Sequence, residues 1–404
     1  MFRALRYRNF QLFISGQLIS LIGTWMQTLA QSWLVYRMTH SAALLGEVGF
    51  ASQIPVLFLG PVAGMLADRY SRRQIVIGTQ VAMMLQALAM AVLTLTHTIQ
   101  VWQIFLLALL LGICNAFDIP ARQSFFVEMV GNEDLMNAIA LNSSMFNVAR
   151  SVGPAIAGIL VAALGEGLCF LLNGLSFIAV ISGLLLMKIK RSASQAGHAP
   201  VMEQFKEGLR YVRNFRAMRT LLLMLGIVSL LGMSYTVLMP IFADQVLQSG
   251  PRGLGELLTS AGLGALIGAL WLARRQRVQG LDRVVAWTCA GFGVSLILFA
   301  LSRTFWLSML LLAPAGFCIM MQLASINTLI QSTVTNAMRG RVMGIYSMMF
   351  LGMAPFGSLI AGYMAHQAGA PAAVIFSGCA SIIGAAVFSL RRHALKIDDQ
   401  LRKF

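Results

Sequence analysis

Twelve long apolar runs are the feature that most limits what this chain can fold into. They fall near residues 10–36, 43–66, 74–96, 100–118, 138–163, 168–188, 218–243, 253–273, 284–302, 304–330, 341–365 and 370–390. A helix that crosses a bilayer needs ~20 mostly apolar residues, and the runs meet that length. Backbone groups in lipid must be hydrogen-bonded within the segment, and the runs are rich in Leu, Ala and Met, so helices are favoured over strands. The sequence therefore predicts an all-α integral membrane protein with about twelve transmembrane helices.

The composition excludes an ordinary soluble domain. Only 11% of the 404 residues are charged, less than half of the roughly 25% that a soluble domain carries. A soluble fold of this size could not hide so much apolar surface, whereas a bilayer removes that requirement. The five cysteines lie in apolar runs without metal-ligand spacing, so we expect no disulfide framework, no metal site and no cofactor. The first run is too long for a cleaved signal peptide and is expected to be the first membrane helix.

The basic residues are distributed as in a membrane protein. The chain has 30 Lys and Arg against 14 Asp and Glu, a net charge of +16. In a soluble protein this excess would indicate a nucleic-acid partner, but here the basic residues cluster in short connections between apolar runs. They gather on alternate connections, and the opposite side holds only Arg37, Arg252 and Arg303. The positive-inside rule then predicts a membrane protein with an even number of spans and both termini in the cytosol, and the distribution argues against a nucleic-acid partner.

The two halves of the sequence repeat. A shift of 204 residues aligns these first-half residues with identical ones in the second half: Gly60, Gly64, Gly112, Cys114, Ser143, Met145, Phe146, Ala157 and Gly158. One ungapped offset that serves three helix pairs predicts two parallel, pseudo-symmetric six-helix bundles, an architecture of transporters. We expect a first bundle over 1–190, a cytosolic linker over 191–217, and a second bundle with a cytosolic tail over 218–404. Within the linker, Phe205, Leu209 and Val212 recur at helical spacing among basic residues and predict an amphipathic helix on the membrane surface.

The connection after the second run carries the most specific motif. It reads Gly64-Met-Leu-Ala-Asp68-Arg69-Tyr-Ser-Arg72-Arg73, which resembles the signature loop of the major facilitator superfamily, with Ser71 where the family usually has glycine. The glycine permits close helix approach, and the acid suits the positive end of a helix. The arginines can pair with a carboxylate on another helix. We interpret these residues as a conformational latch on the cytosolic side; the alternative is an ordinary positive-inside loop.

Two further motifs resemble the exporter branch of that superfamily that includes the enterobactin exporter. The segments 115–124, with Asp118, and 137–150, with Asn147 and Arg150, carry the first resemblance. We expect Asp118 to pair with Arg69 or Arg72; the alternative is an ordinary helix-end carboxylate facing the cytosol.

The second of these motifs lies in the fifth run. Gly153-Pro154-Ala-Ile-Ala-Gly158 resembles the glycine–proline signature of exporters. Proline bends a helix and glycines let helices pack closely, so an ordinary kinked membrane helix is the alternative.

Polar side chains inside the predicted spans are the candidates for substrate binding and proton coupling, because such groups are costly in lipid. Arg150 is expected near mid-span, where it binds an anionic substrate or lowers the pKa of a carboxylate, or else forms a structural pair. Glu47 and Asp118 are the candidate proton carriers, and Asn147, one turn from Arg150, is a further candidate for substrate binding or proton coupling. The alternative for Glu47 is an acid exposed at the outer interface. Gln27 and Gln31 line a cavity or, equally, join helices through hydrogen bonds.

The resemblance implies a secondary-active transporter of the bacterial inner membrane that works by alternating access. No zinc-protease, nucleophile-elbow or nucleotide-binding motif is found, and we expect no enzyme activity. The favoured function is proton-coupled export of a small amphipathic molecule such as a siderophore, drug or metabolite. The expected partners are that substrate, protons and membrane lipid, with the protein a monomer. The alternatives are uptake or facilitated diffusion by the same fold, and a lipid flippase-like protein without ion coupling.

Overall fold

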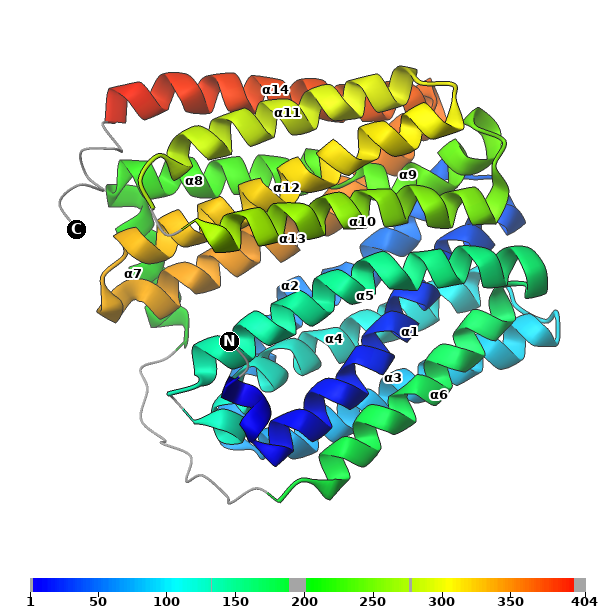
Figure 1. Cartoon of the computed structure of the whole chain (residues 1–404), viewed down its shortest axis with the longest axis horizontal. Coiled ribbons are helices and arrows are strands. Elements are labelled where there is room, and N and C mark those ends of the chain that lie inside the picture. Colours follow the sequence, from blue (N-terminus) through cyan, green and yellow to red (C-terminus); the bar gives the residue numbers. More distant parts are fainter. Residues whose placement is uncertain (1–2, 132, 189–200, 276–277, 396–404) are drawn as a thin grey trace. The chain divides into compact units, whose positions relative to one another are not determined.

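The computed structural model describes residues 3–131, 133–188, 201–275 and 278–395 (Figure 1). Twelve helices in this described part are long and apolar enough to cross a membrane, which confirms the predicted all-α fold. The elements are η1 (Arg3–Arg6), α1 (Arg8–Thr39), α2 (Ala42–Arg69), α3 (Arg72–Leu95), α4 (Val101–Val130), α5 (Leu135–Leu164), α6 (Glu166–Leu186), α7 (Val201–Asn214), α8 (Arg216–Ile227), η2 (Val228–Gly232), α9 (Tyr235–Ile241), η3 (Phe242–Val246), α10 (Gly250–Arg274), α11 (Leu281–Leu301), α12 (Phe305–Thr333), α13 (Asn336–Ala368) and α14 (Ala370–Leu395).

Two helical regions differ from the expectation. The fourth span was expected to end at Asp118, but α4 continues through Pro120 to Val130. A helix passes such a carboxylate when neighbouring side chains satisfy it, as they do here. The seventh span, Arg216–Val246, is a single transmembrane unit assembled from α8, η2, α9 and η3. Two one-turn π-helices interrupt it, and such turns often mark functional positions in helices.

The first compact unit comprises residues 1–40, 51–197 and 249–259. Within it α1 packs against α5 and α6, and α3 packs against α4 and α6. An aromatic cluster joins α1 to α4: the ring of Phe126 lies 5.6 Å from that of Phe13 and 6.4 Å from that of Phe10. These rings are almost completely buried, so they stabilise the helix packing beyond the area that they bury.

The second compact unit comprises residues 41–50, 198–248 and 260–404. Here α11 packs against α12 and α14, and α13 packs against η2, α14 and α7 (Figure 1). The predicted linker helix is present as α7. Its Gly208 and Val212 are buried, and its Glu207 forms an ion pair of 2.9 Å with Arg341 on α13. The division places the start of α2 with the second unit and the start of α10 with the first. The predicted bundle boundaries at 190 and 218 stay a prediction.

Candidate functional site

The carboxylate of Asp118 is buried in the first unit and holds two helices together. Its side chain is 1% exposed. Gln80 on α3 donates a hydrogen bond of 2.9 Å to its Oδ1, and the Thr79 hydroxyl contacts the same oxygen at 3.0 Å. The other carboxylate oxygen lies 3.0 Å from the guanidinium of Arg122, one turn further along α4. A buried charge is tolerated when it is paired and hydrogen-bonded in this way.

The partner of Asp118 corrects the expectation from the sequence. The motif predicts that Asp118 pairs with Arg69 or Arg72, because those arginines belong to the signature loop. Among the described residues the ion-pair partner is Arg122, and Arg72 instead lies 2.8 Å from Glu128 at the end of α4. The spacing of Asp118 and Arg122, four residues apart on one helix, was the signal that could have found this pair.

The third arginine of the loop, Arg73, caps a helix. Arg73 Nε donates to the carbonyl of Leu184 at 2.8 Å, and its terminal nitrogen donates to the carbonyl of Leu185 at 2.9 Å. Both carbonyls belong to the last turn of α6, where backbone acceptors have no partner within the helix. Together with the pair between Arg72 and Glu128, these bonds fasten the start of α3 to α4 and α6. The acceptor Glu128 was not among the residues that the motif indicated.

The remaining loop residues are placed as follows. Arg69 is exposed, and the side chain of Asp68 lies outside the described residues. A methyl group added at Gly64 would meet no heavy atom of the described residues within 4 Å. The close helix approach expected at Gly64 is therefore not found in this structure. The latch role of the five loop residues stays a prediction.

Arg150 lies over an aromatic ring. Its guanidinium carbon is 5.9 Å from the centroid of the Trp25 ring on α1. The ring of Phe146, one turn before Arg150 on α5, meets Trp25 edge to face at 5.6 Å. A cation over an indole face is attracted by the negative face of the ring. Asn147 turns its amide back to the carbonyl of Ser143 at 2.8 Å and is buried. The structure thus places Arg150 over the Trp25 ring, whose edge-to-face neighbour is Phe146, an arrangement that the sequence did not reveal.

At the glycine–proline motif α5 packs closely against α1 and the start of α10. A methyl group at Gly153 would lie 2.5 Å from Cβ of Trp25 and 2.9 Å from the carbonyl oxygen of Ile22. One at Gly158 would lie 2.9 Å from Cα of Gly255 on α10. Between them Pro154 lies inside the helix and supplies no backbone donor. Close packing by glycine, expected from the motif, is found at both glycines.

Glu47 contacts a tyrosine within the second unit. Its Oε1 accepts a hydrogen bond of 2.8 Å from the hydroxyl of Tyr363 on α13. Glu47 is partly exposed and Tyr363 is 49% exposed. The helices approach closely beside this bond, since a methyl group at Gly46 would lie 2.6 Å from the carbonyl oxygen of Ser358. A titratable group thus lies on a tightly packed helix pair.

Gln27 on α1 joins three helices. Gln27 donates to Gln86 on α3 at 2.9 Å and accepts from Asn173 on α6 at 2.7 Å. Gln86 in turn donates to the carbonyl of Leu107 at 3.1 Å. The side chains of all three amides are buried, so for Gln27 the structure favours hydrogen-bonded helix packing over lining a cavity. Gln31 is 8% exposed.

An ion pair that the sequence did not indicate joins α1 to α6. Arg37 meets Glu166 through two parallel bonds, of 2.8 Å and 3.2 Å. The side chain of Glu166 is 6% exposed and that of Arg37 is 56% exposed. Such two-bond geometry is the strong form of an arginine–carboxylate contact. Both residues border predicted helix ends, where a charged residue is common, so the pattern gave no reason to pair them.

The acid–base pair of α4 has no charged counterpart in the repeat. At the offset of 204 residues, Gln322 and Ile326 on α12 correspond to Asp118 and Arg122. Both α12 side chains are completely buried. The repeat therefore keeps the position but replaces the charges by an amide and an aliphatic side chain. Among the described residues no group of three or more His, Cys, Asp or Glu side chains is placed to hold a metal ion.

The fold, with twelve apolar helices among the described residues, defines a polytopic membrane protein, and solved structures share this fold. A bacterial homologue of the human lysosomal transporter Spinster matches 98% of this chain and 97% of its own with a TM-score of 0.76 at 14% identity. The nucleoside transporter NupG matches 95% of this chain and 98% of its own with a TM-score of 0.72 at 14% identity. At these identities the likeness shows the fold alone.

The sequence comparisons give the family. The model of the transmembrane secretion effector family matches residues 1–401, and the chain belongs to this family of the major facilitator superfamily. It is 27% identical to the staphyloferrin A transporter of Staphylococcus aureus over 95% of this chain and 96% of that protein. It is 27% identical to the multidrug efflux pump Tap of Mycolicibacterium fortuitum over 86% and 87%. It is 22% identical to macrolide efflux protein A of Streptococcus pyogenes over 97% and 100%.

Proposed function

We propose that this protein is a proton-coupled exporter of small amphipathic molecules in the bacterial inner membrane, with both termini in the cytosol. Two relatives with efflux in their names match along nearly the whole chain, which supports export over uptake. The clusters of arginine on alternate connections support the orientation. In this proposal the protein works by alternating access as a monomer, with bundles over 1–190 and 218–404 that the segment 191–217 joins.

The observation that carries proton coupling is the hydrogen bond from Tyr363 to Glu47. Ionised, Glu47 accepts a charge-assisted bond that holds α2 against α13 where Gly46 packs closely. Protonation removes the charge and weakens the bond, so the helices separate more readily. A proton taken up at Glu47 thereby biases one conformation over the other, which is what coupling requires.

Asp118 is the less suitable proton carrier. Its two oxygens already face Arg122, Gln80 and Thr79, so the carboxylate is engaged in contacts within and between α3 and α4. We assign it to holding α3 against α4.

The substrate is proposed to meet Arg150 and the two rings beside it. A guanidinium next to Trp25 and Phe146 offers a cation together with two aromatic surfaces. This combination suits an amphipathic molecule that carries an anionic group. The match to the staphyloferrin A transporter of Staphylococcus aureus supports a siderophore as one member of this substrate class.

The test uses purified protein in liposomes with an imposed pH gradient and two probes, staphyloferrin A and ethidium. Antiport predicts accumulation of a probe in vesicles with an acidic lumen, with probe-dependent alkalinisation of the lumen. Proton-coupled uptake predicts accumulation in vesicles with an alkaline lumen instead, and facilitated diffusion predicts equilibration without accumulation. Reorientation of a fluorescent phospholipid, with neither probe moved, would indicate a lipid flippase. Vesicles without protein and vesicles with the Arg150→Ala variant are the controls.

A further inference from the structure

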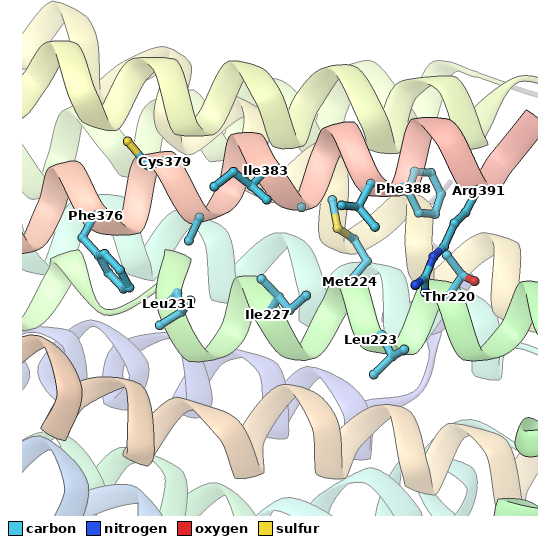
Figure 2. Close-up of a pocket in the computed structure, with 13 residues that line it drawn as sticks. Thr220, Leu223, Met224, Ile227, Leu231, Phe376, Cys379, Ile383, Phe388 and Arg391 are labelled. Carbon is cyan, nitrogen blue, oxygen red and sulfur yellow. The ribbon is translucent and has the colours of Figure 1, made fainter.

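A groove of about 610 Å³ runs along the second unit between α8 with η2 and α14 (Figure 2). Its walls are large apolar side chains that the fold leaves exposed, among them Leu223, Ile227, Phe376 and Ile383. Its floor is formed by side chains that are almost completely buried, such as Met224 and Phe388. The groove does not belong to the site described above, and no residue of that site lines it.

The two ends of the groove differ in chemistry. At one end Arg391 extends from α14 toward Thr220 on α8 (Figure 2). Arg216 and Arg219, at the start of α8, add positive charge near this end. At the other end the lining is Leu231 and Phe376, and Leu231 belongs to the π-helix η2. The groove is therefore apolar along its length with a cation at one end only.

The dimensions match one leaflet of a bilayer. From Thr220 to Leu231 the helix rises about 16 Å at 1.5 Å per residue, and half of a hydrocarbon core of about 30 Å is about 15 Å. Gly384 lies among the residues that line the groove, and a methyl group there would make ordinary van der Waals contact with Met224 Sδ at 3.5 Å, Ile227 Cγ2 at 3.8 Å and Met224 Cε at 4.0 Å. A larger side chain at this position would extend beyond these contacts into the groove.

We propose that the groove binds one acyl chain of an anionic phospholipid, with the headgroup phosphate at Arg391. The apolar walls suit the chain, and the guanidinium suits the phosphate. The cation lies at the arginine-rich end, the cytosolic end in the orientation proposed above, so the lipid comes from the inner leaflet. The lipid bridges α8 and α14 and is retained when bulk lipid is removed.

Native mass spectrometry of the detergent-purified protein tests this assignment, with phosphatidylglycerol and phosphatidylcholine as the probes. The unmodified protein is expected to retain one phosphatidylglycerol and to prefer it to phosphatidylcholine by about tenfold or more. Both headgroups carry the phosphate, but the choline cation of phosphatidylcholine is repelled by Arg391 and the arginines near it, whereas phosphatidylglycerol keeps a net negative charge. Arg391→Ala is expected to remove the preference but keep weak binding of both lipids. Gly384→Leu fills the groove and is expected to remove the binding of both.

Two matched variants serve as controls. Arg303→Ala removes an exposed arginine at the opposite end of the helices, and Ala386→Leu adds the same bulk on the exposed face of α14 outside the groove. Both are expected to bind lipid as the unmodified protein does. If Gly384→Leu does not fold, Ala380→Leu, which also fills the groove, replaces it.

Three results would overturn the assignment. Unchanged lipid preference in Arg391→Ala would exclude the headgroup contact, and unchanged retention in folded Gly384→Leu or Ala380→Leu would exclude the chain site. A dimer that Gly384→Leu dissociates would show that the groove receives a second copy of the chain. Displacement of the retained lipid by a transported probe would assign the groove to substrate instead.

Discussion

The guanidinium of Arg150 lies 5.9 Å above the ring of Trp25 and joins α5 to α1 in the middle of the first unit. The contact places an arginine from the middle of a predicted span beside a ring that Phe146 meets edge to face. An arginine inside a membrane span is energetically costly, and such residues are therefore usually functional. In this account the role is to receive the polar part of the substrate, while the rings receive its apolar part.

Arg150→Ala is expected to abolish transport of an anionic probe while the protein still folds, because the Trp25–Phe146 contact does not depend on the charge. Arg150→Lys keeps a cation but loses the planar group, and partial transport is expected. Transport of staphyloferrin A into proteoliposomes measures this, with thermal unfolding as the check on folding. Full transport by Arg150→Ala would remove Arg150 from the site.

A methyl group tests the close packing of α5 against α1. Gly153→Ala is expected to lower the midpoint of thermal unfolding by several degrees, because the added atom lies 2.5 Å from Trp25 Cβ and 2.9 Å from a backbone oxygen. Gly64→Ala is the matched control, since no described atom lies within 4 Å of the new methyl group. A helical alanine there should leave stability equal or slightly higher. Equal stability of the two variants would show that the close approach at Gly153 is absent in the membrane.

The pair between Asp118 and Arg122 is expected to stabilise the first unit. Arg122→Ala leaves a buried carboxylate without its cation and is expected to cost about 2–4 kcal/mol of unfolding free energy. Asp118→Asn keeps the hydrogen-bonding shape and is expected to cost less. A double-mutant cycle in a denaturing detergent titration measures the coupling of the two residues. Additive effects of the two changes would contradict the pairing.

The ion pair between Arg37 and Glu166 gives a further stability test. Arg37→Ala is expected to cost about 1–3 kcal/mol of unfolding free energy, because it leaves the buried carboxylate of Glu166 unpaired. The exposed arginine alone would contribute little to stability. Arg252→Ala breaks an exposed pair with Glu256, whose side chains are 71% and 35% exposed. That variant is expected to cost no more than about 0.5 kcal/mol. Equal losses in the two variants would mean that burial of Glu166 does not matter.

Hydropathy determined most of the fold. The expected spans 10–36 and 138–163 match α1 and α5 to within a few residues. Lipid imposes one rule on every segment, namely that backbone groups are satisfied within it, so length and polarity suffice. The exception is the end of α4, where Asp118 and Pro120 resembled a helix end. Their helix continues because α3 supplies partners for the carboxylate.

The candidate site was less accessible to sequence reasoning. Arg150 and Glu47 stand out by charge alone, but their neighbours Trp25 and Tyr363 lie on other helices and have no distinctive pattern. Which face of one membrane helix meets another depends on packing between residues far apart in the sequence. The same reason hid Gln86 and Asn173, the partners of Gln27.

Proton-driven transport by the Glu47→Gln variant tests the central claim most directly. Glutamine keeps the size and the acceptor oxygen for Tyr363 but removes the titratable group. In liposomes with an acidic lumen, the account predicts that accumulation of the probe falls at least about tenfold. Exchange of the same probe across the membrane without a pH gradient is expected to continue, because it needs no proton. Accumulation by Glu47→Gln equal to that of the unmodified protein would contradict proton coupling through Glu47.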